Sequence, residues 1–404
     1  MGPRLTVGDY FQWLAQIDKR LSGKKTPVAL LDRYARALPG LPAQPEPRNI
    51  LLDLEEAREL YVTLAQDGMI PNRPLEIEDA CSDCKAMKPG EPRSFVVHGH
   101  GRDFKGVVTF DEQARRYVID STDLAESFHQ VGDRPGPDLV TFLNRQQAFS
   151  ILPDSTDVLY ADGTFFSPSI ATGKDFDSDR FQIGKVLDPH VGLEDLRSEK
   201  GTKTLRGGSG WEPDSVFGWL DGGLDRLLDN PKLVICDDMG TESADFLALD
   251  RDDNRIVLIH CKARKKRSLY SASALQEICG QAVKNCGTLN LFRPLKPPNI
   301  KRWHEPWSSN AVAGTVKSRI RRGLVGRKTS DFGEHLWLTF DARIRDPNAE
   351  REVWLVLGAT LSKKELESEL RKAAPAPEAI QATHLLQSTL ASIGGGKCEV
   401  ANSL

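Results

Sequence analysis

Residues 234–263, VICDDMGTESADFLALDRDDNRIVLIHCKA, contain the pattern that decides the expected fold. Apolar runs bounded by Gly, Asp and Asn predict three consecutive strands, at Lys232–Cys236, Phe246–Leu249 and Arg255–His260. Each run is too short for an ordinary buried helix, and the turn residues between the runs are typical of tight connections. The segment therefore predicts the strands of one sheet.

Two chemically active positions stand at the ends of these strands. Asp245 immediately precedes the second strand, and a His-x-Lys sequence, His260 to Lys262, ends the third. Residues two apart on a strand face the same side, so His260 and Lys262 should project together while Cys261 points away. If the neighbouring strand places Asp245 alongside, a carboxylate, an imidazole and an ammonium converge on one spot.

Further elements surround this segment. Helices are expected at Pro213–Leu228 and Ser273–Lys284, and strands at His335–Phe340 and Glu352–Leu357. Two closing helices are expected at Lys363–Ala373 and Gln381–Ala391. The alternation of helices and strands indicates an α/β domain with a mixed sheet.

The length of 404 residues predicts more than one domain. We expect a helical N-terminal region at residues 1–90, a strand-rich recognition or docking domain at 91–205, and the α/β domain at 206–404. The helices expected in the first region are Val7–Ser22, Pro27–Ala37 and Leu54–Asp67. The polar, glycine-rich stretch at residues 196–210, LRSEKGTKTLRGGSG, is interpreted as a flexible connection or an exposed loop.

The Asp and His-x-Lys pattern resembles the PD-(D/E)xK nuclease superfamily, over roughly the last 190 residues. In that family an Asp opens the second strand of a hairpin, and an acid stands two residues before a Lys on the neighbouring strand. Asp245 matches the Asp, Lys262 matches the Lys, and His260 occupies the position of the acid. The resemblance implies a restriction-endonuclease-like mixed β-sheet flanked by helices, and hydrolysis of phosphodiester bonds.

The resemblance also implies a divalent metal ion, Mg²⁺ or Mn²⁺, held by Asp245, His260 and the backbone carbonyl of Cys261. Such an ion would polarise the scissile phosphate and activate a water, and Lys262 would stabilise the developing negative charge. Imidazole suits softer metals than Mg²⁺. Either His260 ligates directly and favours a transition ion, or a nearby acid such as Glu242 supplies the missing charge as a ligand.

In many relatives the helix after the Lys strand adds a polar residue to the site. Gln276 and Gln281 are the candidates, with Glu277 as a third. The two glutamines are five residues apart, which separates them by about 140° on an ideal helix, so both cannot face one atom. Gln276 is taken as the catalytic candidate. The preceding helix could likewise supply an acid, Asp214 or Asp221.

The sequence around the His-x-Lys pattern is basic. Residues 260–330 contain 16 Lys and Arg but only two acids, a net charge of +14 in a chain whose total is -3. Phosphate neutralisation by such side chains gives most of the non-specific affinity for nucleic acid. The expected contacts are Arg264, Lys265, Lys266, Arg267, Lys301, Arg302, Arg319, Arg321 and Arg322. Trp303 and Trp307 could stack on unpaired bases.

Cys81 and Cys84 form a CxxC, and His98 and His100 follow at a spacing that could complete a separate structural Zn²⁺ site. Incidental cysteines and alternating strand residues explain the same pattern. No phosphate loop is found, so no nucleotide cofactor is expected.

The composition, with 39% hydrophobic and 27% charged residues, is typical of a soluble globular protein. No signal peptide or membrane-spanning run is found, and the odd number of cysteines, seven, fits a reducing compartment, so we expect a cytoplasmic protein without a membrane partner. DNA is the favoured nucleic-acid partner, and the resemblance suggests restriction or anti-phage defence with a helicase or other protein. The alternatives are an inactive nucleic-acid-binding scaffold and a partner-activated, RNA-directed effector nuclease.

Overall fold

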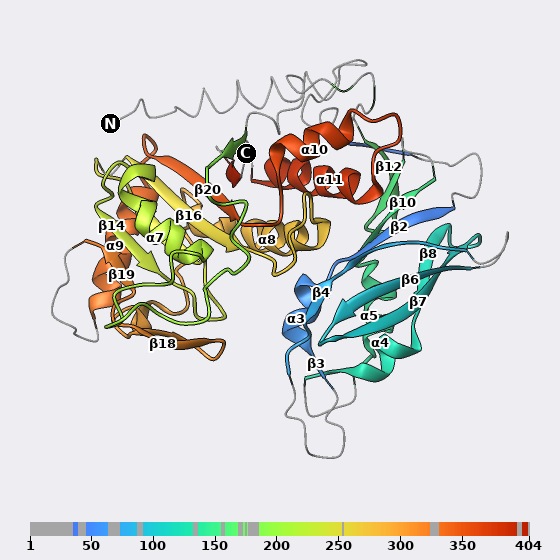
Figure 1. Cartoon of the computed structure of the whole chain (residues 1–404), viewed down its shortest axis with the longest axis horizontal. Coiled ribbons are helices and arrows are strands. Elements are labelled where there is room, and N and C mark those ends of the chain that lie inside the picture. The colour runs from blue at the N-terminus through green and yellow to red at the C-terminus, as the bar shows by residue number, and fades with distance from the viewer. Residues whose placement is uncertain are drawn as a thin grey trace, which may run out of the picture.

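The computed structural model covers residues 1–404. It describes residues 35–38, 46–63, 73–86, 92–131, 136–154, 158–168, 173, 176, 186–252, 254–323, 331–393 and 398–402. Two halves are apparent in Figure 1, a C-terminal half built on one mixed sheet and an N-terminal half rich in strands.

The C-terminal half is organised by a seven-stranded sheet with the order β13-β21-β20-β16-β15-β14-β19. Strands β14 (Leu233–Cys236), β15 (Phe246–Leu249) and β16 (Arg255–Lys262) form the antiparallel meander that the sequence predicted. Beyond β16 the sheet becomes parallel, through β20 and β21. The other strands are β13 (Leu187–Pro189), β19 (Ile320–Arg322), β20 (Glu350–Leu357) and β21 (Cys398–Asn402). The expectation of an α/β domain with a mixed sheet is confirmed.

Helices cover both faces of this sheet because its strands are buried on both sides. Val257 and Ile259 of β16 belong to the core that contains helix α7 (Val216–Leu227), whereas Ile256 and Leu258 belong to the core of α8 (Ala272–Asn285). Helices α9 (Phe332–Ile344), α10 (Lys363–Leu370) and α11 (Pro377–Ser392) also contribute to the α8 core. Smaller elements are the 3₁₀ turns η2 (Cys286–Leu289) and η3 (Ile300–Arg302) and the hairpin β17 (Trp307–Ser309) and β18 (Val312–Val316). His260 and Lys262 therefore face α8.

The described residues of the N-terminal half form three antiparallel sheets. The largest has the order β1-β12-β11-β10-β2-β5, formed by β1 (Ala35–Ala37), β2 (Pro47–Leu52), β5 (Cys81–Asp83), β10 (Phe149–Pro153), β11 (Leu159–Ala161) and β12 (Thr164–Pro168). A second has the order β4-β6-β7-β8, formed by β4 (Ile77–Asp79), β6 (Arg93–Gly99), β7 (Arg102–Asp111) and β8 (Arg116–Asp120). Strands β3 (Tyr61–Thr63) and β9 (Phe128–Gln130) pair, and the helices are α3 (Glu55–Leu60), α4 (Thr122–Ser127) and α5 (Leu139–Gln146).

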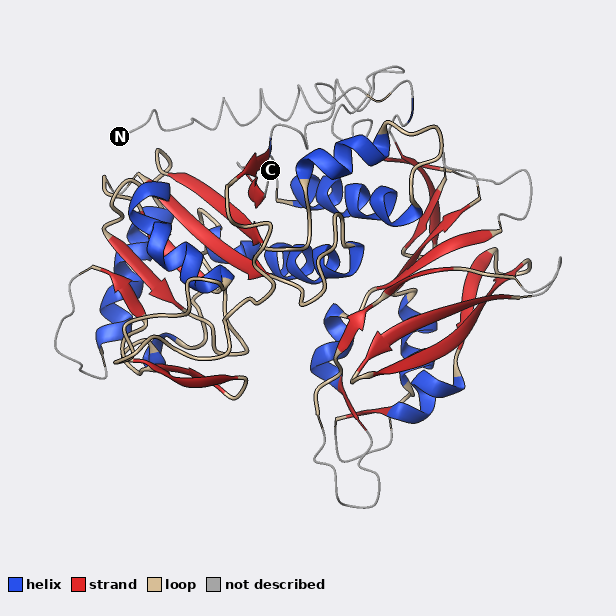
Figure 2. Ribbon diagram, in the orientation of Figure 1, coloured by secondary structure: helices blue, strands red, loops and turns tan. Residues whose placement is uncertain are grey.

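Helices α8 and α11 join the halves, and Figure 2 shows α8 between the two groups of strands. The hydroxyl of Ser273 accepts hydrogen bonds from the amides of Ala80 and Cys81, both at 3.0 Å. Gln381 of α11 donates to the side chain of Asn49 at 3.0 Å. Apolar residues of both halves belong to one continuous core, so the junction is a packed interface.

Two expectations about the fold are wrong where the structure describes the chain. Within residues 1–90 the described elements are mostly strands, with only α3 helical, and β2 pairs with β10 across the boundary expected near residue 90. The helix expected at Val7–Ser22 lies outside the described residues. The strand expected at His335–Phe340 is part of α9, because Trp337, Phe340 and Ile344 are buried at the spacing of a helix. Residues 196–210 are coil with several exposed side chains, as the loop interpretation predicted, and backbone hydrogen bonds hold them to the start of α7 and to the region of β18.

Every helix in the described ranges is too short or too polar to traverse a lipid bilayer.

Candidate metal centre

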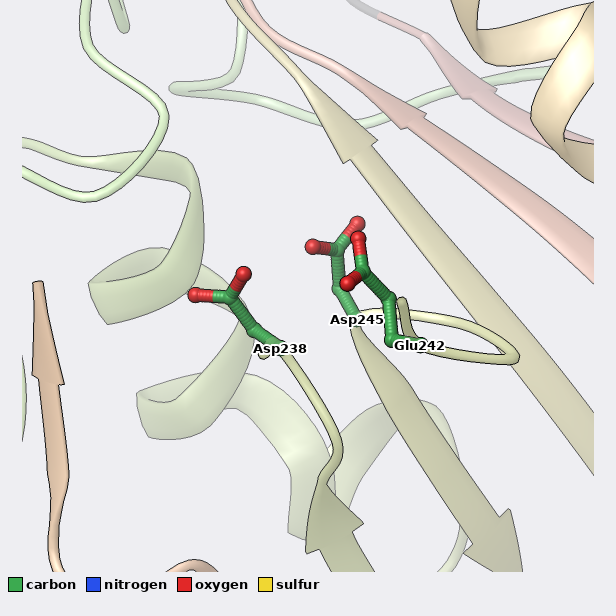
Figure 3. Close-up of side chains that lie close together, drawn as sticks. All are labelled: Asp238, Glu242 and Asp245. Atoms are coloured by element: carbon green, nitrogen blue, oxygen red, sulfur yellow. The ribbon is translucent and has the colours of Figure 1, made fainter. Parts of the chain in front are cut away.

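Three carboxylates meet where β14 ends and β15 begins. Asp238 follows β14, Glu242 lies in the connecting turn, and Asp245 immediately precedes β15. A carboxylate oxygen of each lies within 4.8 Å of an oxygen of the other two, and Figure 3 shows the three groups turned toward one another. We call this group the acidic triad. Among the described residues it is the only set of three or more His, Cys, Asp and Glu side chains with this geometry.

Buried hydrogen bonds fix the turn that carries the acidic triad. The carboxylate of Asp237 accepts bonds from the amide of Ser243 at 3.0 Å and from the indole of Trp303 at 2.6 Å. The indole of Trp307 donates to Asp238 Oδ2 at 2.8 Å. Arg319 donates to the backbone carbonyl of Asp238 at 2.9 Å. The position of Asp238 is therefore set by the core of the domain.

Asp245 is almost fully buried, with 6% of its surface exposed. Its Oδ2 accepts a hydrogen bond from the backbone amide of Cys261 at 2.7 Å, which links the start of β15 to the end of β16. Burial and the nearby carboxylate of Glu199 raise the pKa of Asp245 well above its ordinary value. A cation in the acidic triad would relieve this unfavourable concentration of negative charge.

The loop before α7 contributes two residues that the sequence analysis missed. Glu199 and Lys200 lie in residues 196–210, and the carbonyls of Ser198 and Glu199 accept the amides of Val216 and Phe217 at 3.0 and 2.9 Å. Lys200 Nζ lies 2.9 Å from Asp238 Oδ1 and 3.3 Å from Glu199 Oε1. Burial opposes the charge of Lys200, but the surrounding acids raise its pKa well above the ordinary value. Only the tertiary fold brings this loop to the acidic triad, so no local sequence signal marks it.

Lys262 extends from β16 toward α8. Its Nζ forms an ion pair with Glu277 and lies 3.9 Å from Glu199 Oε2. Arg58 of α3 approaches the same Glu277 carboxylate at 2.7 Å. Burial alone would raise the pKa of Glu277, but Lys262 and Arg58 lower it to about 2. Glu277 thus keeps its charge and fixes the ammonium of Lys262 at the edge of the site.

His260 is on the same face of β16 as Lys262, as the alternation predicted, but it is not part of the acidic triad. It is buried, with 2% exposed, and within the described chain its Nε2 atom has no hydrogen-bond partner. Burial lowers its pKa to about 4, so the imidazole is neutral at pH 7. His260 and Glu242 line one cavity of about 770 Å³, together with Arg58, Gln281 and Lys284. Gln276 Oε1 is buried without a partner among the described residues, and Gln276 does not line this cavity.

The donor set fits a hard divalent ion. Mg²⁺ prefers oxygen ligands at 2.0–2.1 Å, so opposite ligands of an octahedral ion are about 4.2 Å apart. The oxygens of the acidic triad are separated by at most 4.8 Å, and small side-chain rotations would close the difference. Of the four ligands expected from the sequence, Asp245 and Glu242 belong to the acidic triad and His260 does not. The fourth was the backbone carbonyl of Cys261; the structure shows the amide of Cys261 donating to Asp245. Asp238 is an additional ligand candidate.

The nine basic residues expected to contact nucleic acid differ in their surroundings. Lys265, Lys266 and Lys301 are exposed, and Arg267 and Arg302 are exposed beside Glu194 and Glu305. Arg264 joins the two halves, donating to the Glu78 carbonyl at 3.1 Å and lying 3.5 Å from Asp79. The other three arginines are engaged within the protein: Arg319 is buried, Arg321 forms an ion pair with Asp221, and Arg322 forms an ion pair with Asp225. Asp221 thus lies in an ion pair outside the acidic triad, and Asp214 is exposed.

Trp303 and Trp307 are completely buried, so neither ring offers a face to a base. The interpretation of these residues as stacking platforms is wrong, because their indoles serve as donors to Asp237 and Asp238.

The side chains considered for Zn²⁺ have other partners. His98 lies 3.0 Å from Asp103 and 3.5 Å from Glu78, and His100 accepts the amide of Glu76 at 3.1 Å. Burial raises the pKa of the Cys84 thiol to about 12, which opposes the thiolate that zinc requires. No three of Cys81, Cys84, His98 and His100, all of which are described, gather within ligand distance of one another.

Comparisons with protein families, with curated proteins and with solved structures find no match to this chain.

Proposed function

We propose that this protein is a metal-dependent nuclease that hydrolyses phosphodiester bonds, and that its C-terminal half is a variant of the PD-(D/E)xK fold. The observation that carries the proposal is the position of the acidic triad between the end of β14 and the start of β15, next to strand β16, which ends with Lys262; the Nζ of Lys262 lies 3.9 Å from Glu199. The family pattern requires an Asp and a Lys on adjacent strands, and the amide of Cys261 bonds to Asp245 across those strands. The helix that follows the Lys strand is α8.

His260 departs from the family pattern, and Asp238 and Glu242 compensate for it. An acid within reach of Asp245 favours a catalytic centre over an inactive scaffold, and two acids lie within 4.8 Å of it. A bound Mg²⁺ or Mn²⁺ would act as a Lewis acid on the scissile phosphate. Asp238, Glu242 and Asp245 would hold the ion, and Lys262 would stabilise the negative charge that develops on the phosphate oxygens.

Nucleic acid would reach this centre along the exposed basic side chains that follow β16. Lys265, Lys266 and Arg267 come directly after the strand that ends with Lys262, and all three are exposed. Such contacts neutralise phosphates without reading sequence. DNA is proposed as the substrate, because the family mostly cuts DNA, in a cytoplasmic setting of restriction or anti-phage defence with a helicase or another protein.

The test is cleavage of labelled single- and double-stranded DNA and RNA with EDTA, Mg²⁺ or Mn²⁺. We expect wild-type protein to cut in the presence of metal, and Lys262→Ala to lose about 10²–10³-fold in rate while binding is retained. Lys364→Ala is the control, since Lys364 is an exposed lysine of α10 that lies outside the proposed nucleic-acid contacts. Equal rates for wild type and Lys262→Ala would refute the assignment, and tight binding without cleavage would favour the scaffold or the partner-activated effector.

A further inference from the structure

A lysine already contributes a positive charge to the candidate metal centre. Lys200 Nζ lies 2.9 Å from Asp238 Oδ1 and 3.3 Å from Glu199 Oε1, and 25% of its side chain is exposed. The ammonium is also 5.4 Å from the centre of the Phe217 ring. Holding a long side chain in this position costs conformational entropy, which the attraction of the acids must outweigh. Lys200 therefore acts as a fixed counter-ion inside the centre.

With all of its acids ionised, as metal ligands must be, the centre carries charges that do not balance without a further cation. The contributing acids are Glu199, Asp238, Glu242 and Asp245. Lys200 and Lys262 provide one ammonium each, so two negative charges remain in excess. This excess equals the charge of one divalent ion.

Two neighbouring acids do not change this balance. Glu277 has Arg58 at 2.7 Å, so this pair is neutral. Asp237 directs its carboxylate to the amide of Ser243 and the indole of Trp303 instead of to the acidic triad. The guanidinium of Arg319 donates to the backbone carbonyls of Cys236 and Asp238, on either side of Asp237, so a positive charge lies in the same turn.

A separate feature also points to a missing ligand beside the acidic triad. His260 Nε2 is buried and, in the described part of the chain, has no hydrogen-bond partner. His260 and Glu242 line the same cavity. Buried polar atoms without a protein partner are rare, and a bound water or ion commonly satisfies them.

We infer that Lys200 takes the place of the second metal ion of a two-metal site, so that this centre holds a single divalent cation between Asp238, Glu242 and Asp245. In two-metal sites the ions are about 3.5–4 Å apart and share carboxylate ligands. Asp238 would be shared here between the divalent ion and the ammonium of Lys200. The inference rests on the proposed nuclease centre and specifies its metal content.

The test is the number of Mn²⁺ ions bound by the full chain, measured by isothermal titration calorimetry and by electron paramagnetic resonance. Wild type should bind one ion. Lys200→Met keeps most of the aliphatic length but removes the charge, so it should bind two ions, with the first about tenfold tighter than in wild type. Two ions about 4 Å apart would show spin coupling. Lys203→Met is the matched control, because Lys203 is in the same loop with 69% of its side chain exposed, and it should bind one ion.

The outcomes separate this inference from the proposed function. Two ions per wild-type chain, with metal-dependent cleavage, would overturn the role of Lys200 and leave the nuclease intact. No Mn²⁺ binding and no cleavage would overturn both. A folded Lys200→Met protein that binds one ion with unchanged affinity would also overturn the inference. The wild-type measurement needs no substitution, so a count of two ions would overturn the inference even if Lys200→Met does not fold.

Discussion

Replacing Glu277 with glutamine should destabilise the protein in a pH-dependent manner. Glu277 of α8 lies between Lys262 of β16 and Arg58 of α3, and its pKa is lowered to about 2 from an ordinary 4.5. This difference of about 2.5 pKa units between the unfolded and folded states corresponds to about 3.4 kcal/mol of unfolding free energy at neutral pH. Glutamine still accepts a hydrogen bond, so we expect Glu277→Gln to lower the free energy of unfolding by about 2 kcal/mol at pH 7.

The dependence on pH distinguishes this charge effect from a general packing defect. Because the pKa of Glu277 is depressed in the folded state, its contribution is complete above about pH 4.5 and is lost as the pH falls toward 2. Urea denaturation at pH 7 and pH 3 should therefore show a gap between wild type and Glu277→Gln that narrows in acid. Glu56→Gln, an exposed acid of α3, is the control and should have no comparable effect. Equal stabilities at pH 7, or a gap that persists unchanged at pH 3, would refute the reasoning.

Three further predictions concern the site and its surroundings. His260→Glu should retain or raise Mg²⁺-dependent cleavage because a carboxylate is a better ligand for a hard ion, and loss of cleavage in every metal would show that the imidazole has another task. His384 is buried in α11, and burial lowers its pKa to about 3, so the folded protein binds a proton there less readily than the unfolded chain does. Wild type should therefore lose about 2 kcal/mol of unfolding free energy between pH 6.5 and 5, a loss that His384→Leu should not show. Equal losses for the two proteins in denaturation experiments at these pH values would contradict this. Lys265→Ala combined with Lys266→Ala should weaken nucleic-acid binding equally across sequences and flatten its salt dependence, and sequence-selective loss in a binding titration would exclude phosphate contacts.

The sheet of the C-terminal half could be predicted because its local patterns agree with its tertiary structure. The strands β14, β15 and β16 are short apolar runs between turn residues, and they are found where the pattern indicated. The strand predicted around Trp337 was wrong because the aromatic and apolar residues of this segment suit a strand as well as a helix. Only their burial at helical spacing shows that the segment is α9. The strands within residues 1–90 were missed because pairings such as β2 with β10 join residues about a hundred positions apart.

The candidate site was only partly accessible from sequence for the same reason. Asp245 and Lys262 could be found because they are close to one another along the chain and fit a strand-end pattern. Glu199 and Lys200 are in a loop whose composition suggests exposure, and only its hydrogen bonds to the start of α7 bring it to the centre. Asp238 lies within residues 234–263, but its role depends on the backbone turn that directs it toward Asp245.

Cleavage by the Asp238→Asn variant tests the central claim most directly, because Asp238 is the ligand that the fold adds to the sequence pattern. Wild type and Asp238→Asn would be compared on labelled duplex DNA in Mn²⁺ and in EDTA, with near-ultraviolet circular dichroism to verify that both are folded. We expect Mn²⁺-dependent cleavage by wild type that falls at least about a hundredfold in the variant. A folded Asp238→Asn protein that cuts at the wild-type rate, or wild-type cleavage that persists in EDTA, would contradict a metal centre at the acidic triad.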